Sequence, residues 1–170
     1  MTAFDAGALV VAGGACITDV RAARIPNTLT LLGVIAGLLA HALLPAGAGV
    51  AASLAGAAAG LAVFLPFFVL GGMGGGDVKL MAAVGAWLGW PTIVTAALTI
   101  AIVGGGVALG VAVTRGYLRQ ALGNLLALAR FWIVAGVRPE PSLTLAEGRG
   151  PRLPYAVPIL LGLLVTLWRR

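Results

Sequence analysis

Six apolar runs, separated by short polar or glycine-rich stretches, divide the chain. About 20 apolar residues in a helix cross the ~30 Å hydrocarbon core of a bilayer. The pattern therefore predicts an all-α, polytopic membrane protein with about six transmembrane helices. The expected segments are residues 4–18, 29–44, 50–70, 80–90, 92–113 and 153–168.

The fourth and fifth segments come from one nearly unbroken apolar run, residues 80–113. As a single helix this run would be about 51 Å long, which exceeds the ~30 Å core. Gly89, Trp90 and Pro91 supply a break, because proline starts helices more readily than it continues them. The fourth segment is then short for a crossing. It either re-enters the membrane or begins earlier, near Asp77.

The basic residues predict the orientation of these spans. With six alternating spans, nine of the 11 Lys and Arg residues fall on one side of the membrane. The positive-inside rule makes that side the cytoplasm and puts both termini outside. Arg169 and Arg170 lie on the other side and favour an odd number of spans instead. The nine residues are Arg21, Arg24, Lys79, Arg115, Arg119, Arg130, Arg138, Arg149 and Arg152.

The connection at about 114–152 is the longest polar region. Within residues 116–136, helical spacing puts Arg119 and Arg130 on one face, opposite Leu122 and Leu126. This pattern favours a helix lying in the cytoplasmic interface, with a role in guiding a substrate as the alternative. Residues 138–150 contain prolines and glutamates and are expected to form a solvated loop.

Composition supports a lipid environment for one domain spanning residues 1–170. Hydrophobic residues make up 61% of the chain and charged residues 9%, against about 25% charged in soluble domains. The net charge of +6 is spread over several loops, so nucleic-acid binding is not expected. The single cysteine, Cys16, excludes a disulfide framework and paired-cysteine zinc sites. We expect no metal and no cofactor.

Ionisable side chains near the lipid are few, and each is a functional candidate because burying charge in a membrane is costly. Asp19 closes the first segment and Asp77 opens the fourth, both on the predicted cytoplasmic side. Two carboxylates that share one proton can hydrolyse a peptide without a metal. The ordinary alternative is that Asp77 caps a helix after a glycine-rich turn. His41, toward the opposite face, is expected to be a wet interface residue.

Three runs resemble motifs of the type IV prepilin leader peptidases, a GxGD-type aspartic peptidase family. GGGDVKL at 74–80 resembles the GxGD-x-K-L motif. DVR at 19–21, continued by IPN at 25–27, resembles the first-aspartate motif. RLPYAVP at 152–158 resembles the segment that opens the last span, with Ala156 where glycine is frequent.

The resemblance implies an aspartic endopeptidase that cuts a short basic leader from prepilins at the cytoplasmic face of the bacterial inner membrane. It makes Asp19 and Asp77 catalytic, and Gly74, Gly76 and Lys79 substrate-binding or supporting. The expected partners are the prepilin and the lipid bilayer. The chain is most similar to the small form of tight-adherence (Tad, Flp-like) pilus systems. It shows neither the inserted domain nor the paired cysteines of larger members, so methyltransferase activity is not expected.

Other functions use similar residues. Proteases of the presenilin and signal-peptide-peptidase kind also carry GxGD, but the Pro-Ala-Leu segment found in them is not present in this sequence. A small membrane carrier would use intramembrane carboxylates for proton or cation movement. A secretion-machine scaffold would need neither aspartate.

Overall fold

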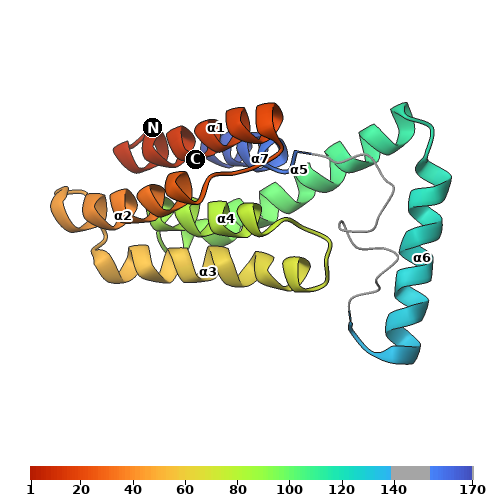
Figure 1. Ribbon diagram of the computed structural model, residues 1–170. Coiled ribbons are helices and arrows are strands. Elements are labelled where there is room, and N and C mark those ends of the chain that lie inside the picture. Colours follow the sequence, from red (N-terminus) through yellow and green to blue (C-terminus); the bar gives the residue numbers. More distant parts are fainter. Residues whose placement is uncertain (139–153, 170) are drawn as a thin grey trace.

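The computed structural model describes residues 1–138 and 154–169, and these residues form helices and no strands. The all-α prediction is therefore confirmed. Figure 1 shows the helices in chain order. They are α1 (Ala3–Ala22), α2 (Asn27–Leu43), α3 (Val50–Val69), α4 (Gly75–Leu88), α5 (Thr92–Thr114), α6 (Leu118–Ala135) and α7 (Ala156–Trp168).

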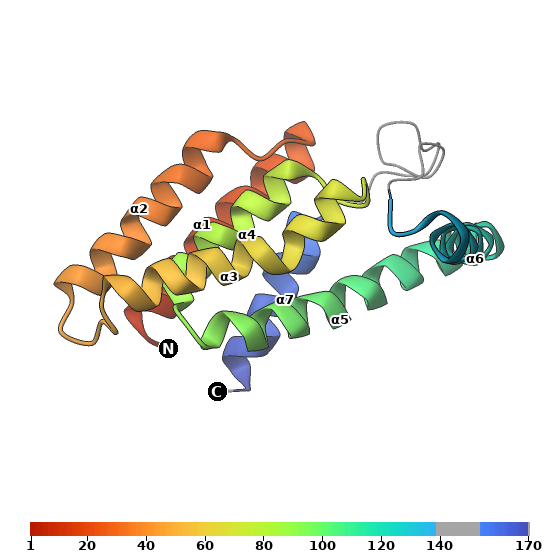
Figure 2. The same cartoon turned by 90° about the horizontal axis from the view of Figure 1, so that it is seen from below.

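Six of these helices, all except α6, run up and down beside one another, and both termini lie at the same end (Figure 1). The α1–α2 and α3–α4 connections lie at the opposite end, which we call the site end. Helix α6 stands beyond the site end, across the direction of the others, and Figure 2 shows it end-on. This is the orientation that a helix lying in the plane of a membrane interface requires.

Three helices, α1, α3 and α5, are long and apolar enough to cross a membrane, and α2 and α7 are apolar but shorter. Helix α4 has 14 residues and is almost enclosed by the others, since ten of them are buried. It packs mainly against α1, α2 and α3. The predicted fourth segment is thus a central helix whose length is not set by lipid contact.

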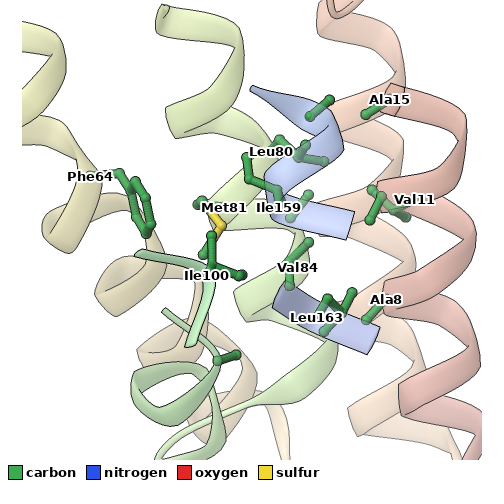
Figure 3. Packing of buried hydrophobic residues seen from close by; sticks show 14 of the residues in the cluster. Ala8, Val11, Ala15, Phe64, Leu80, Met81, Val84, Ile100, Ile159 and Leu163 are labelled. Atoms are coloured by element: carbon green, nitrogen blue, oxygen red, sulfur yellow. The ribbon is translucent and has the colours of Figure 1, made fainter. Parts of the chain in front are cut away.

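The core forms where α4 meets α1 and α7 (Figure 3). Leu80, Met81 and Val84 on α4 are completely buried, and so is Leu163 on α7. Helix α3 crosses α4 with the two backbones touching, because Gly56 and Gly85 face each other. A methyl group on either glycine would overlap the other's carbonyl oxygen. Such close crossings of small residues are how membrane helices gain packing energy without a hydrophobic effect between them.

Two helix boundaries differ from the prediction in a way that matters for function. Helix α1 continues past residue 18 to Ala22 and stops where Ala23 adopts a left-handed conformation with φ 48°. Asp19 therefore belongs to the last turn of α1. Helix α4 begins at Gly75 and not at residue 80. The alternative start near Asp77 is correct, and Asp77 lies in the first turn of α4.

His41 corrects another expectation, because it is buried and not wet. Its Nδ1 accepts the Ala48 N–H at 3.2 Å, so the ring carries its hydrogen on Nε2 and donates it to the Trp87 carbonyl at 3.0 Å. Its ring also lies 4.3 Å from the ring of Phe4. His41 thus ties α1, α2, α4 and the α2–α3 loop together at the end away from the site.

Candidate active site

Asp19 and Asp77, which are 58 positions apart, come together at the site end. Helix α1 runs toward this end and supplies Asp19 from its last turn, whereas α4 starts there and supplies Asp77. The two carboxylates lie close enough for the charge of Asp19 to act on Asp77. Asp77 is 8% exposed and Asp19 is half-buried. The fold therefore brings the two predicted catalytic carboxylates together.

Asp19 also contacts α7, the last helix of the chain. Its Oδ2 accepts the backbone N–H of Ala156, the first residue of α7, at 3.2 Å. The first N–H groups of a helix have no partner within the helix, so a carboxylate from another helix can satisfy one of them. This hydrogen bond orients the Asp19 carboxylate and joins α1 to α7.

The glycine-rich stretch before Asp77 lets the backbone lie against the carboxylate. Asp77 accepts a hydrogen bond from the backbone of Gly74. A Cβ on Gly74 would lie 2.9 Å from Asp77 Oδ2, too close for an ordinary contact. A Cβ on Gly76 would lie 3.1 Å from Cβ of Ile25, in the α1–α2 connection. Gly74 thus shapes the carboxylate's surroundings, and Gly76 allows α4 to pack closely against the segment after Asp19.

Tyr155 is a site residue to which the sequence had assigned no role. Burial, then the Asp77 carboxylate, and then Tyr117 raise the pKa of the Tyr155 phenol above its usual value of 10.0. The phenol thus keeps its proton at neutral pH and lies within electrostatic reach of Asp77. The sequence did contain a sign of this residue, because Tyr155 belongs to the motif-like run at 152–158. Its proximity to Asp77 follows from how α7 packs, which no local pattern records.

Lys79 is exposed, and its Nζ donates a hydrogen bond to Asn27 Oδ1 at 3.0 Å. Asn27 is the first residue of α2, so this contact fastens the start of α2 to α4. The two residues also line a shallow cleft of about 360 Å³ between α2, α3 and α4. Lys79 therefore supports the segment that follows Asp19.

A second cleft, of about 400 Å³, reaches the site end at Tyr155. Its walls come from α3, α5 and α7, and Tyr155 is part of its lining. No three His, Cys, Asp or Glu side chains gather at one place in residues 1–138 and 154–169. The polar groups that the described chain brings to this place are two carboxylates, a phenol and backbone amides.

Residues 7–109 match the family model described as the type IV leader peptidase family. This region includes both aspartates and covers more than half of the chain. The chain belongs to the type IV leader peptidase family. The glycine-flanked Asp77 and the helix-end Asp19 are thus residues of a leader-peptidase fold, and Tyr155 lies outside the matched region.

Curated relatives of this leader peptidase family member include "Prepilin leader peptidase/N-methyltransferase" of Burkholderia pseudomallei, 36% identical over 126 residues. A protein of the same name from Aeromonas salmonicida is 34% identical over 124 residues. The alignments cover 66% and 68% of this chain but only 40% and 42% of those relatives. No solved structure matches the chain.

Proposed function

We propose that this protein is an aspartic endopeptidase that removes the leader peptide from type IV prepilins, with Asp19 and Asp77 as its catalytic pair. The observation that carries the proposal is the meeting of these two carboxylates, from α1 and α4, at one end of the bundle. Paired carboxylates are the arrangement that aspartic peptidases use.

Two carboxyl groups at short distance cannot both ionise freely, so together they hold one proton. The proposed chemistry follows from this shared proton. The ionised carboxylate takes a proton from water as the water oxygen bonds to the scissile carbonyl carbon. The protonated carboxyl gives its proton to the carbonyl oxygen, which forms a tetrahedral diol. The C–N bond then breaks as a diol hydroxyl returns its proton through the carboxylates and the departing amine gains one.

The surrounding residues have supporting parts in this proposal. Gly74 leaves room against Asp77 Oδ2, and an extended substrate backbone would lie along the glycine-rich stretch 74–76. Gly76 and Lys79 position the α1–α2 segment and the start of α2. The Tyr155 phenol is a neutral donor beside Asp77.

The proposed setting is the bacterial inner membrane, with the site end toward the cytoplasm. In the described part of the chain, seven basic residues lie at the end of α1, in the α1–α2 connection, at the start of α4 or between the end of α5 and residue 138, as the positive-inside rule expects of a cytoplasmic side. The substrate is a Flp-like (Tad) prepilin with a basic leader, and residues 1–170 act as one peptidase unit. The N-methyltransferase in the relatives' names is not proposed for this chain.

The test is co-expression with a prepilin that carries a basic leader, followed by a gel shift for loss of the leader. Wild type, Asp19→Asn and Asp77→Asn are compared at equal membrane levels. We expect cleavage by the wild type and accumulated precursor with both variants.

Cleavage by both variants would remove the catalytic assignment and leave a carrier or a scaffold as the better explanation. Normal assembly of pili with uncleaved pilin in both variants would favour the scaffold. Ion flux through wild-type vesicles without any cleavage would favour the carrier.

A further inference from the structure

The 400 Å³ cleft that ends at Tyr155 is almost wholly apolar, and we call it the α3–α5–α7 groove. It is open to the outside of the bundle, since Phe67 on α3 is 54% exposed and Leu98 on α5 is 61% exposed. In a membrane protein, this outside is lipid. The groove is therefore accessible from the bilayer.

Helix α5 presents mainly small residues to the groove. These residues recur at spacings of three and four, which places them on one face over about 17 Å at 1.5 Å per residue. A strip of small residues lets another helix approach with its backbone close, which is how membrane helices associate. The strip consists of Ala97, Ala101, Gly104, Gly105 and Ala108.

The groove is continuous with the carboxylate pair. Tyr155 lines the groove and its phenol interacts with Asp77. The next residue, Ala156, donates its N–H to Asp19. The start of α7 thus forms one wall of the groove, donates a hydrogen bond to Asp19 and lies within electrostatic reach of Asp77.

We propose that the α3–α5–α7 groove binds an apolar helical segment of the peptide substrate that directly adjoins the scissile bond. This inference rests on the proposed peptidase function and adds the means by which the substrate is held. Tyr155 marks the point at which the bound chain leaves the groove and extends across the carboxylates.

The bilayer dictates the form of the occupant. A peptide chain that enters the hydrocarbon region must satisfy its own backbone hydrogen bonds, so it enters as a helix. Its side chains must be apolar to match the groove, whose volume suits a few large aliphatic side chains. A lipid chain would also fit by polarity, but it would gain nothing from the strip of small residues or from the connection to Asp77.

Two neighbouring glycines provide a matched test. Gly105 lines the groove and Gly106 does not, and a Cβ at either position meets nothing within 4 Å. Gly105→Leu should therefore fill the groove, and Gly106→Leu should add the same side chain to the lipid-facing side of α5 without strain. Both proteins are purified and reconstituted into vesicles.

Each protein is given two substrates with the same basic leader. One continues after the scissile bond into an apolar helix anchored in the vesicle, and the other is a soluble peptide that ends a few residues after that bond. We expect Gly105→Leu to lower kcat/KM for the anchored substrate by at least about 10-fold, mainly through KM. Gly106→Leu should match wild type on both substrates, and Gly105→Leu should match it on the soluble peptide.

Equal cleavage of the anchored substrate by the two variants would overturn the groove assignment and fits a lipid occupant. Loss of the soluble peptide's cleavage in Gly105→Leu would also overturn it, because the damage would then lie at the carboxylates. A loss that accompanies dissociation of a dimer would make a second copy the occupant. Wild type that cleaves neither substrate would remove the proposed peptidase function itself.

Discussion

The two ends of the bundle treat their polar groups in opposite ways. Away from the site, the buried side chains of His41 and Ser53 form hydrogen bonds to backbone groups. Ser53 Oγ donates to the Ala86 carbonyl at 2.7 Å, and His41 bonds to the Ala48 N–H and the Trp87 carbonyl. At the site end, the buried Asp77 carboxyl group lies within electrostatic reach of a second carboxyl group, that of Asp19. Satisfied buried polar groups hold a fold together, whereas a buried carboxyl group beside a second one costs stability, and such arrangements cluster at functional sites.

The largest effect is expected when the carboxylate charges at the site end are removed. Asp19→Asn and Asp77→Asn should each lower the cleavage rate by at least about 100-fold, because each removes a general acid–base group. Relief of the repulsion should leave the unfolding temperature unchanged or raise it. Rates in purified protein and thermal unfolding in detergent measure the two effects.

Asp5 is the matched control for this prediction. It lies at the far end and shares a capping box with Thr2 at the start of α1. Asp5→Asn should keep the wild-type cleavage rate. A comparable loss of rate in Asp5→Asn would show that any carboxylate change disables the protein, and the contrast between the two ends would fail.

A second change removes a hydrogen-bonded side chain, that of His41, at the end away from the site. His41→Ala should lower the free energy of unfolding by about 1–3 kcal/mol, because the Trp87 carbonyl and the Ala48 N–H lose their partner. Cleavage per folded molecule should stay at the wild-type level. Leu39→Ala, on the lipid-facing side of the same helix, is the control and should lower the free energy of unfolding by a smaller amount. A fall in cleavage per folded molecule would contradict the assignment of His41 to stability alone.

The sequence predicted the helical class and the main apolar segments, because hydrophobic runs are local signals. It singled out Asp19 and Asp77 as candidates, because acids at the ends of apolar runs are few. It left the start of α4 open between residue 80 and the region of Asp77, because glycine has a low helix propensity and the packing of Gly75 and Gly76 against Phe68 and Ile25 is not a local signal. It could not place Tyr155 beside Asp77 or form the α3–α5–α7 groove. Both depend on the packing of α5 against α7, helices far apart in the chain. The predicted loop at 138–150 lies almost wholly outside the described residues.

At the site end, a change at Tyr155 should lower the cleavage rate less than a change at either aspartate. Tyr155→Phe removes one hydrogen-bond donor and should lower the cleavage rate by about 2- to 10-fold. Since the pKa of the phenol is raised above 10.0, the group stays protonated from about pH 6 to pH 9. The ratio of wild-type to variant rates should therefore be constant across that range. A ratio that falls as the pH rises would mean that the phenol titrates and that its environment differs from the one described.

The smallest effect is expected at Lys79, whose contact with Asn27 is exposed. Lys79→Met and Asn27→Ala should each change the free energy of unfolding by less than about 1 kcal/mol. The double variant should be no less stable than the weaker single variant, because both changes break the same hydrogen bond. Additive losses would show that Lys79 and Asn27 act through different neighbours.

The central claim is that Asp19 and Asp77 work as one unit, and a double-mutant comparison tests it most directly. Residual single-turnover rates are measured for Asp19→Asn, Asp77→Asn and the variant that carries both changes. Groups that act together show strongly non-additive losses, so the account predicts that the double variant retains the same residual rate as either single variant. Losses that multiply would contradict it, because they would mean that the two carboxylates contribute independently.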